Sequence, residues 1–321
     1  MPANFPLLEE AQSFRRVGTG KQPLFRWDRD GYVMFYAPGY LCVVSQSAAA
    51  QFETNLLASQ FVRPDAPNLD RGGQAELGRH AQLALVEASR WQTEPFAPEC
   101  LTLYANNECN LRCVYCFADP SPEPKVRLNL ETIAAAAEVV AGSCRRKARP
   151  FYVAFHGGGE PMLHHERVEA ALARLETIAA RHQVKCFRYL ASNGVMPEAH
   201  ALWAARHFDL IGLSCDGTAD IQDSQRPGWD GVGTYRIVER TARLWRAESV
   251  RLHVRATITR ASLHRQAEIA HYICEQFAPE EIRFEPVYRG GRAVVSASLD
   301  DNQAGDFVAR FLEAQAVATR F

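Results

Sequence analysis

Three cysteines stand close together in the sequence, where their thiolates could bind a metal. Cys109, Cys113 and Cys116 have the spacing C-x3-C-x2-C within the segment ECNLRCVYCF, residues 108–117. Soft thiolates grouped in this way suit an iron–sulfur cluster or zinc. Structural zinc normally takes four protein ligands, and neither Cys144 nor a histidine lies at a suitable spacing nearby. The spacing therefore favours a [4Fe–4S] cluster with one open iron over zinc or over three buried core thiols.

Small and polar residues follow the next three predicted strands. Residues 156–161 read HGGGEP, in which the glycines let a ligand approach the backbone and the carboxylate can face a cation. Residues 191–194 (ASNG) and 213–217 (LSCDG) place short polar side chains after two further strands. Such residues also form ordinary turns and caps, and His156 could be satisfied by the backbone. Each of these motifs is weak on its own.

Taken together, the motifs resemble the radical S-adenosylmethionine (SAM) superfamily. The three cysteines, with the aromatic Tyr115 before the third, are similar to its cluster-binding signature. Residues 158–161 resemble its GGEP motif, although the extra glycine leaves the alignment of His156 open. Residues 214–226 are similar to the S-x-D-G and D-x-x-R pattern of the sulfatase-maturing and peptide-modifying branch.

This resemblance implies a cofactor site and a reaction. In the superfamily, three cysteines hold a [4Fe–4S] cluster whose open iron binds SAM, and one electron cleaves SAM to a 5′-deoxyadenosyl radical that abstracts hydrogen from the substrate. We expect Arg255 to bind the SAM carboxylate, because a guanidinium can do so bidentately. His156 is the candidate catalytic residue facing the substrate. The predicted SAM-binding residues are Tyr115, Gly158, Gly159, Glu160, Ser192, Asn193, Ser214, Asp216 and Arg255.

The elements that must position these residues alternate between strand and helix. Six apolar or β-branched runs are each followed by a helical pattern, which predicts parallel strands with the functional residues at their carboxyl ends. We therefore predict an α/β fold with a partial (β/α)6 barrel, and a last helix over residues 302–320. The basic run 145–149 should end the first barrel helix as solvated surface. The predicted strands are 101–105, 151–156, 186–191, 208–214, 251–258 and 282–287.

The fifth predicted strand has one polar face. His253, Arg255 and Thr257 alternate there with apolar residues, and Arg283 and Glu285 repeat the pattern in the next strand. A strand buried on both faces would be apolar throughout. The alternation predicts either an edge strand facing solvent or a barrel lumen lined for a charged ligand.

Residues 1–97 have a different pattern, which predicts a small N-terminal α+β domain ahead of a radical SAM barrel over residues 98–321. Its order of elements resembles the winged recognition element of peptide maturases, so a peptide-binding role is expected. Turn residues separate three short strands, and two helices follow. The expected elements are strands 24–28, 32–37 and 40–45, a helix from Ser45 or Ser47 to Ser59, a loop over 64–73 and a helix over 74–91.

Composition limits the choice of partners. The 321 residues include 36 Lys plus Arg against 37 Asp plus Glu, so the basic excess of a general nucleic-acid binder is missing. No run approaches the roughly 18 apolar residues of a membrane span, and the start lacks a signal-peptide pattern. We expect a cytoplasmic peptide maturase with a precursor peptide or protein substrate and a flavodoxin- or ferredoxin-type electron donor. An RNA-modifying radical SAM enzyme and a non-catalytic iron–sulfur or metal module are the alternatives.

The remaining cysteines are scattered singly and are expected to be core or strand thiols. No cysteine follows Cys274, so the cysteine-rich SPASM or twitch extension of the peptide-modifying branch is expected to be absent from this chain. These single cysteines are Cys42, Cys100, Cys144, Cys186, Cys215 and Cys274.

Overall fold

The computed structural model has two compact units, Met1–Phe96 and Ala97–Phe321, each with a hydrophobic core of its own. The structure describes residues 14–17, 24–29, 32–37, 40–58, 96–118, 125–287, 291–293, 297–300 and 303–321.

The N-terminal unit contains an antiparallel sheet in the order β1-β2-β3-β4, followed by helix α1. Its core includes Phe35 and Phe52, whose ring centroids are 4.8 Å apart. The three predicted strands and the first helix are confirmed. The short β1 was not predicted, because FRR has neither the length nor the apolar alternation of a strand. The predicted loop 64–73 and helix 74–91 lie outside the described residues. The elements are β1 (Phe14–Arg16), β2 (Phe25–Arg29), β3 (Tyr32–Ala37), β4 (Tyr40–Ser45) and α1 (Gln46–Ala58).

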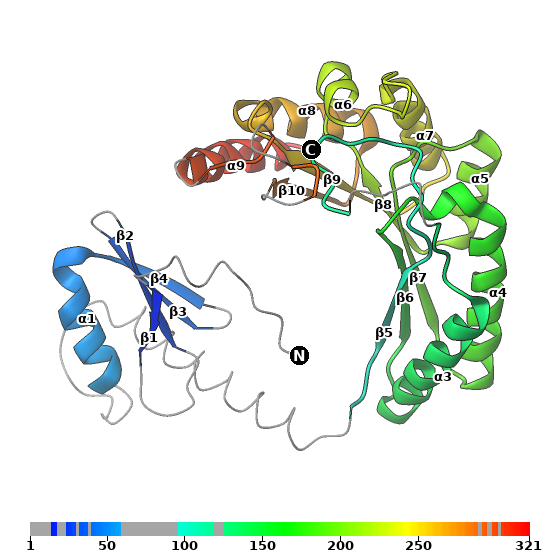
Figure 1. Cartoon of the computed structure of the whole chain (residues 1–321), viewed down its shortest axis with the longest axis horizontal. Helices are drawn as coiled ribbons and strands as arrows, with labels where there is room; N and C mark the ends of the chain where they lie inside the picture. Colours follow the sequence, from blue (N-terminus) through cyan, green and yellow to red (C-terminus); the bar gives the residue numbers. More distant parts are fainter. Residues whose placement is uncertain are drawn as a thin grey trace. The chain divides into compact units, whose positions relative to one another are not determined.

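The C-terminal unit is built on a curved sheet in the order β10-β9-β8-β7-β6-β5, in which every neighbouring pair is parallel. Figure 1 shows α3, α4 and α5 lying against the outer side of this sheet. The predicted α/β partial barrel is confirmed. Its strands are β5 (Cys100–Tyr104), β6 (Phe151–His156), β7 (Cys186–Ser192), β8 (Leu210–Ser214), β9 (Leu252–Ile258) and β10 (Glu281–Pro286).

The helices lie between and after these strands. Asn129 caps α3 by accepting a hydrogen bond from the backbone of Glu131. Of the basic residues predicted as solvated surface, Arg145, Arg146 and Lys147 form the exposed last turn of α3, and the exposed Arg149 follows the helix. Among the described helices, none is long and apolar enough to cross a membrane. The helices are α3 (Leu130–Lys147), α4 (His165–Arg181), α5 (Glu198–His207), α6 (Ala219–Gln225), α7 (Tyr235–Ala247), α8 (Gln266–Phe277) and α9 (Ala304–Ala318), with short 3-10 turns η2 (Pro161–His164) and η3 (Leu263–Arg265).

Strand β9 shows how the sheet separates its core from its lumen. Leu252 and Val254 are buried on one face, whereas His253, Arg255 and Thr257 are half-buried on the other. Strand β9 lies between β8 and β10, so the edge-strand interpretation of its polar face is wrong. The polar face turns instead toward the inside of the partial barrel, where polar side chains can meet a ligand.

Candidate active site

A cavity of about 370 Å³ lies where the carboxyl ends of the strands meet the cysteine loop. Its wall combines that loop, the glycine turn after β6, the ends of β7 and β8, and the polar faces of β9 and β10. The structure therefore brings nearly all of the predicted site residues together. Those lining the cavity are Cys109, Cys113, Tyr115, Cys116, His156, Gly158, Gly159, Glu160, Ser192, Asn193, Ser214 and Arg255.

The cysteine loop is held in place by the last residue of α6 and the segment that follows it. The backbone N–H of Arg112 donates to Pro227 over 2.8 Å, and that of Val114 donates to Gln225 over 2.9 Å. Leu111 also forms an isolated antiparallel bridge with Gly228. The loop is thus fixed by backbone contacts that do not depend on a bound metal.

The three cysteine side chains share the cavity but differ in their surroundings. The Cys109 sulfur accepts hydrogen bonds from the Leu111 backbone at 3.4 Å and the Asn193 side chain at 3.7 Å. Burial raises the pKa of the Cys109 thiol to about 12, and the charge of Glu160 adds to this effect. Burial also raises the pKa of Cys113. Iron binding would require these thiols to lose their protons. The positive charge of the iron would then stabilise the buried thiolates.

The donor set of the three thiols can be compared with the needs of a single metal ion and of a cluster. Within the described residues, no three His, Cys, Asp or Glu side chains are grouped closely enough to hold one metal ion. A single zinc ion needs every sulfur at about 2.3 Å. A multi-iron cluster gives each cysteine an iron of its own and so spaces its ligands more widely. Three cysteine thiols that line one cavity match the donor set of a cluster with one open iron, whereas structural zinc takes four protein ligands.

The glycine turn after β6 packs directly on the start of the cysteine loop. Gly158 has a φ of +92°, and a Cβ added at Gly159 would lie 1.9 Å from the carbonyl oxygen of Glu108. The backbone N–H of Glu160 donates to that same oxygen over 2.7 Å. Only glycine permits this close approach between the two segments.

We expect Gly159→Ala to displace the cysteine loop, because the added methyl group would collide with backbone that cannot swing away. The expected loss is about 1–3 kcal/mol in the free energy of unfolding, the usual cost of overpacking. Denaturant unfolding and the iron content after reconstitution measure the effect. Gly157→Ala is the matched control, because its Cβ would meet nothing closer than the Tyr104 ring at 3.7 Å. Equal stability of the two variants would contradict this prediction.

Glu160 joins the glycine turn to the end of β7. One of its carboxylate oxygens accepts from the Ser192 hydroxyl at 2.9 Å and the Met162 backbone at 3.1 Å, and the other accepts from the Asn193 backbone at 2.7 Å. The side chain is only 3% exposed, and burial raises its pKa. A carboxylate offers about four acceptor positions, so three protein contacts leave one for a cation in the cavity.

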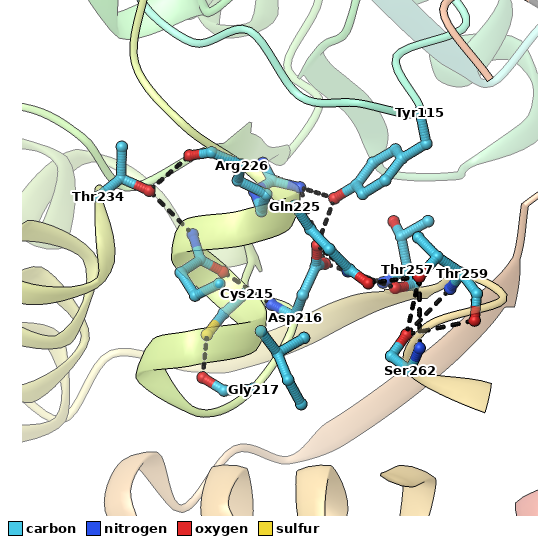
Figure 2. A network of polar contacts seen from close by, with 12 residues as sticks. Tyr115, Cys215, Asp216, Gly217, Gln225, Arg226, Thr234, Thr257, Thr259 and Ser262 are labelled. Carbon is cyan, nitrogen blue, oxygen red and sulfur yellow. Dashed lines mark hydrogen bonds and ion pairs between the residues drawn. The ribbon is translucent and has the colours of Figure 1, made fainter. Parts of the chain in front are cut away.

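Asp216 is not among the residues that line the cavity. Figure 2 shows its carboxylate surrounded by protein donors: the Tyr115 hydroxyl at 2.6 Å, the Gln225 amide at 2.8 Å and the Thr257 backbone at 2.9 Å. Asp216 has no exposed surface, and burial raises the pKa of Tyr115, which keeps its hydroxyl protonated as the donor. The geometry therefore gives Asp216 a supporting position behind Tyr115, whereas the sequence suggested direct contact with SAM.

Arg255 lies on the lumen side of β9 beside His156. Its Nη2 lies 3.4 Å from His156 Nε2, and its Nη1 lies 3.6 Å from the carboxylate of Glu285. Arginine can only donate, so His156 Nε2 accepts and the proton of the neutral ring is on Nδ1. Burial, aided by the charge of Arg255, lowers the pKa of His156 and favours this neutral form. The Nδ1 atom is buried without a hydrogen-bond partner among the described residues.

Comparison with curated sequences shows which proteins this chain is similar to. No protein-family model matches the sequence. The chain is 25% identical over 177 residues to the cysteine-type anaerobic sulfatase-maturating enzyme of Clostridium perfringens strain 13, covering 54% of this chain and 47% of that enzyme. A second strain of the same species has a relative with the same identity and coverage. The chain thus spans about half the length of the curated relatives it matches.

Solved structures share the fold. Native anSMEcpe with bound AdoMet and the Cp18Cys peptide matches with a TM-score of 0.57 and 22% identity, over 67% of this chain and 59% of that one. Streptococcus suis SuiB bound to S-adenosylmethionine matches with a TM-score of 0.53 and 12% identity, over 95% and 71% of the two chains. This chain shares the partial-barrel fold of these SAM-bound proteins. The resemblance inferred from the cysteines and the GGEP-like turn is confirmed.

Within this fold, the cavity wall includes a buried arginine, Arg226, that was not among the predicted SAM-binding residues. Arg226 lines the cavity, and its Nη1 donates to the Tyr115 hydroxyl over 2.6 Å. Its Nε is buried and has no hydrogen-bond partner in the part of the chain that the structure describes. The signal was present in the sequence, because Arg226 ends the D-x-x-R pattern, but spacing alone did not show that the chain returns to the cysteine loop.

Proposed function

We propose that this chain is a radical SAM enzyme that modifies a peptide or protein side chain. The observation that carries the proposal is the cavity itself, in which Cys109, Cys113 and Cys116 share one wall with the glycine turn and the strand ends. These cysteines would hold a [4Fe–4S] cluster. When bound, the cluster supplies the electron that cleaves SAM to a 5′-deoxyadenosyl radical.

The side chains around the cavity offer complementary partners for SAM. The remaining acceptor position of Glu160 suits the amino group of SAM, and the glycine turn lets that group approach the backbone. The Nε of Arg226 suits its carboxylate, because a buried N–H donor without a partner gains most from an anionic acceptor. Ser214 lies at the end of β8, where its hydroxyl can reach the ribose or the carboxylate. Arg255, which already contacts His156 and Glu285, suits the substrate side of the cavity better.

Several observations favour a peptide over RNA as the substrate. The curated relatives are sulfatase-maturating enzymes, and the solved structures include SuiB bound to the precursor peptide SuiA. The net charge of −1 offers no general attraction for RNA. A reduced cytoplasmic location with a flavodoxin- or ferredoxin-type donor fits an odd number of cysteines, nine, of which three have a metal-binding spacing.

Anaerobic reconstitution tests the proposed chemistry. We expect the protein to bind about four irons and four sulfides per chain and to form 5′-deoxyadenosine from SAM only when a reductant is present. A peptide and an RNA substrate assayed in parallel would separate the two radical SAM alternatives. Iron binding without any 5′-deoxyadenosine would instead support a non-catalytic iron–sulfur module.

Ser214→Ala should weaken SAM binding without removing the cluster, because no iron contact is proposed for this hydroxyl. Loss of a hydrogen bond to a charged group costs about 1.5–3 kcal/mol, or roughly ten- to a hundredfold in affinity. Calorimetric titration with SAM measures this change. The matched control is Ser224→Ala, because the Ser224 hydroxyl bonds within α6 to Ile221. Unchanged SAM affinity in Ser214→Ala would show that the residue has been assigned wrongly.

Glu160→Gln should also weaken SAM binding. Its effect is harder to interpret, because a glutamine NH2 group would face one of the three protein donors that now contact the carboxylate. Iron content must therefore be measured alongside SAM affinity for this variant.

We further propose that the N-terminal unit recognises the substrate peptide. Its antiparallel sheet can add an extended peptide at an edge strand, which takes affinity from main-chain hydrogen bonds. Deleting residues 1–96 should leave reductant-dependent SAM cleavage intact and remove peptide modification, because each unit has its own core. Mass spectrometry of the peptide and 5′-deoxyadenosine assays measure the two activities separately. Full peptide modification by the shortened chain would exclude the recognition role.

A further inference from the structure

We propose that Asn193 is a positioning residue that raises the reduction potential of the iron–sulfur cluster, because its side chain donates a hydrogen bond to the sulfur of Cys109. The inference rests on the proposed function, in which Cys109 binds an iron of that cluster. The sequence suggested that Asn193 contacts SAM. The structure points its carboxamide at a cysteine instead.

The hydrogen bonds of the Asn193 carboxamide fix its orientation. Its Oδ1 accepts from the backbone N–H of Val195 over 2.8 Å, so the other end of the carboxamide is the NH2 group. This NH2 group donates to Asn110 Oδ1 over 2.8 Å and to the sulfur of Cys109 over 3.7 Å. An amide NH2 group has two N–H bonds, one for each of these acceptors. A flipped carboxamide would lose all three contacts, because its oxygen and its NH2 group would change places.

The surroundings hold Asn193 in this position without a bound cluster. The residue is only 6% exposed, and its backbone N–H donates to the carboxylate of Glu160 over 2.7 Å. Its partner Asn110 is fixed in turn, because Asn110 Nδ2 donates to the carbonyl oxygen of Val195 over 2.8 Å. The N–H donor therefore faces Cys109 before any electron arrives, and no reorganisation is needed when one does.

A donor at this sulfur stabilises the reduced form of the cluster. The added electron increases the negative charge on the cysteine sulfurs, and hydrogen bonds to those sulfurs are one of the factors that set the potential. The backbone N–H of Leu111 donates to the same Cys109 sulfur at 3.4 Å, so this ligand receives two donors. The step itself adds one electron from an external reductant, and no proton or chemical group moves with it.

The charges around Cys109 show why a donor is needed there. Burial is the main cause that raises the pKa of the Cys109 thiol; the carboxylate of Glu160 adds to the rise, and the guanidinium of Arg226 opposes it. Glu160 thus disfavours negative charge on this sulfur, and an added electron meets the same repulsion. Asn193 offsets part of it through its side chain, while its backbone holds Glu160 in place.

A redox titration tests the proposal without catalysis. Reconstituted full-length wild type and Asn193→Ala are titrated without SAM, and the EPR signal of the reduced cluster is followed against the applied potential. Loss of the donor should lower the equilibrium constant for reduction about three- to tenfold, which moves the potential of a one-electron couple about 30–60 mV lower. Asn193→Asp should shift it in the same direction, because aspartate keeps the size of the side chain but has no NH2 group.

Asn129→Ala is the matched control. It removes a carboxamide of the same kind, which caps α3 by accepting from Glu131, and Asn129 is exposed and outside the cavity wall. This variant should be less stable because the helix loses its cap, yet it should keep the wild-type potential. A general loss of stability is thereby separated from an effect on the cluster.

Pulsed EPR of the wild-type protein provides a measurement that needs no variant. Protein made with asparagine labelled with ¹⁵N only in the side-chain amide should show a ¹⁵N coupling to the reduced cluster. Asn110 carries the same label, but its amide nitrogen donates to a backbone carbonyl. Absence of the coupling would contradict the hydrogen bond to Cys109 even if both Asn193 variants failed to hold a cluster.

Rates with two reductants separate this role from contact with SAM. With dithionite, Asn193→Ala should form 5′-deoxyadenosine about three- to tenfold more slowly than wild type, and titanium(III) citrate, a stronger one-electron reductant, should restore the rate. A wild-type potential in both Asn193 variants, an equal shift in Asn129→Ala, or equal slowing with both reductants together with weaker SAM binding would each overturn the proposal. If wild type binds no iron, or forms no 5′-deoxyadenosine with either reductant, the proposed function fails instead.

Discussion

Replacing Cys109, Cys113 or Cys116 by alanine is expected to abolish the iron–sulfur cluster and all SAM cleavage. Among the described residues, the three thiols are the only cysteines that line the cavity wall. A cluster held by three cysteines therefore has no spare ligand. Iron and sulfide analysis, the visible absorption of the cluster and 5′-deoxyadenosine formation measure the loss in each variant.

Cys186→Ala is the matched control for these three variants. Cys186 is a half-buried free thiol at the start of β7, at the end of the strand that is remote from the cavity. It should keep full iron content and full SAM cleavage. A complete [4Fe–4S] spectrum in any one of the three loop variants would contradict the ligand assignment.

The barrel could be predicted from the sequence because its strands have clear boundaries and a consistent pattern. The predicted strand 151–156 coincides with β6, where Phe151, Val153 and Phe155 are buried and alternate with less buried residues. Parallel strands bring their carboxyl ends to one edge, so residues that follow different strands could be expected to meet there. The cavity confirms that the cysteines, the glycine turn and Ser214 do meet.

The positions of Asp216 and Arg226 could not be predicted from their distance along the chain. Both follow β8, and the chain leaves the strand there, so alternation no longer determines which side chain faces the lumen. Helix α6 and the backbone pairing of residues 225–228 with the cysteine loop bring Arg226 into the cavity wall. The same path places Asp216 behind Tyr115. The pairing of residues 225–228 with the cysteine loop depends on tertiary contacts, which short sequence motifs do not encode.

Asp216→Ala is expected to lower the stability of the protein strongly, because it breaks a buried network of charges and hydrogen bonds. The carboxylate accepts three hydrogen bonds, and Arg226 Nη1 lies 3.9 Å from it. Removing one partner of a buried ion pair leaves the other charge uncompensated, which typically costs about 3–5 kcal/mol. Denaturant unfolding of the cluster-free protein measures this loss. Asp230→Ala is the control, because Asp230 is exposed and, within the described residues, accepts a hydrogen bond only from the nearby Val232 backbone N–H.

A double-mutant cycle with Tyr115→Phe can then show whether Asp216 acts through Tyr115 and Arg226. The Tyr115 hydroxyl donates to Asp216 and accepts from Arg226, so it is the link between the buried carboxylate and the cavity wall. Residues in one such network usually couple by about 0.5–3 kcal/mol, and the double variant should therefore lose less stability than the two single losses added together. If Asp216 bound SAM directly instead, Asp216→Ala would keep the stability of the cluster-free protein and lose only SAM affinity. The two outcomes differ in a measurement made without any cofactor, so the position of Asp216 can be tested independently of the radical chemistry.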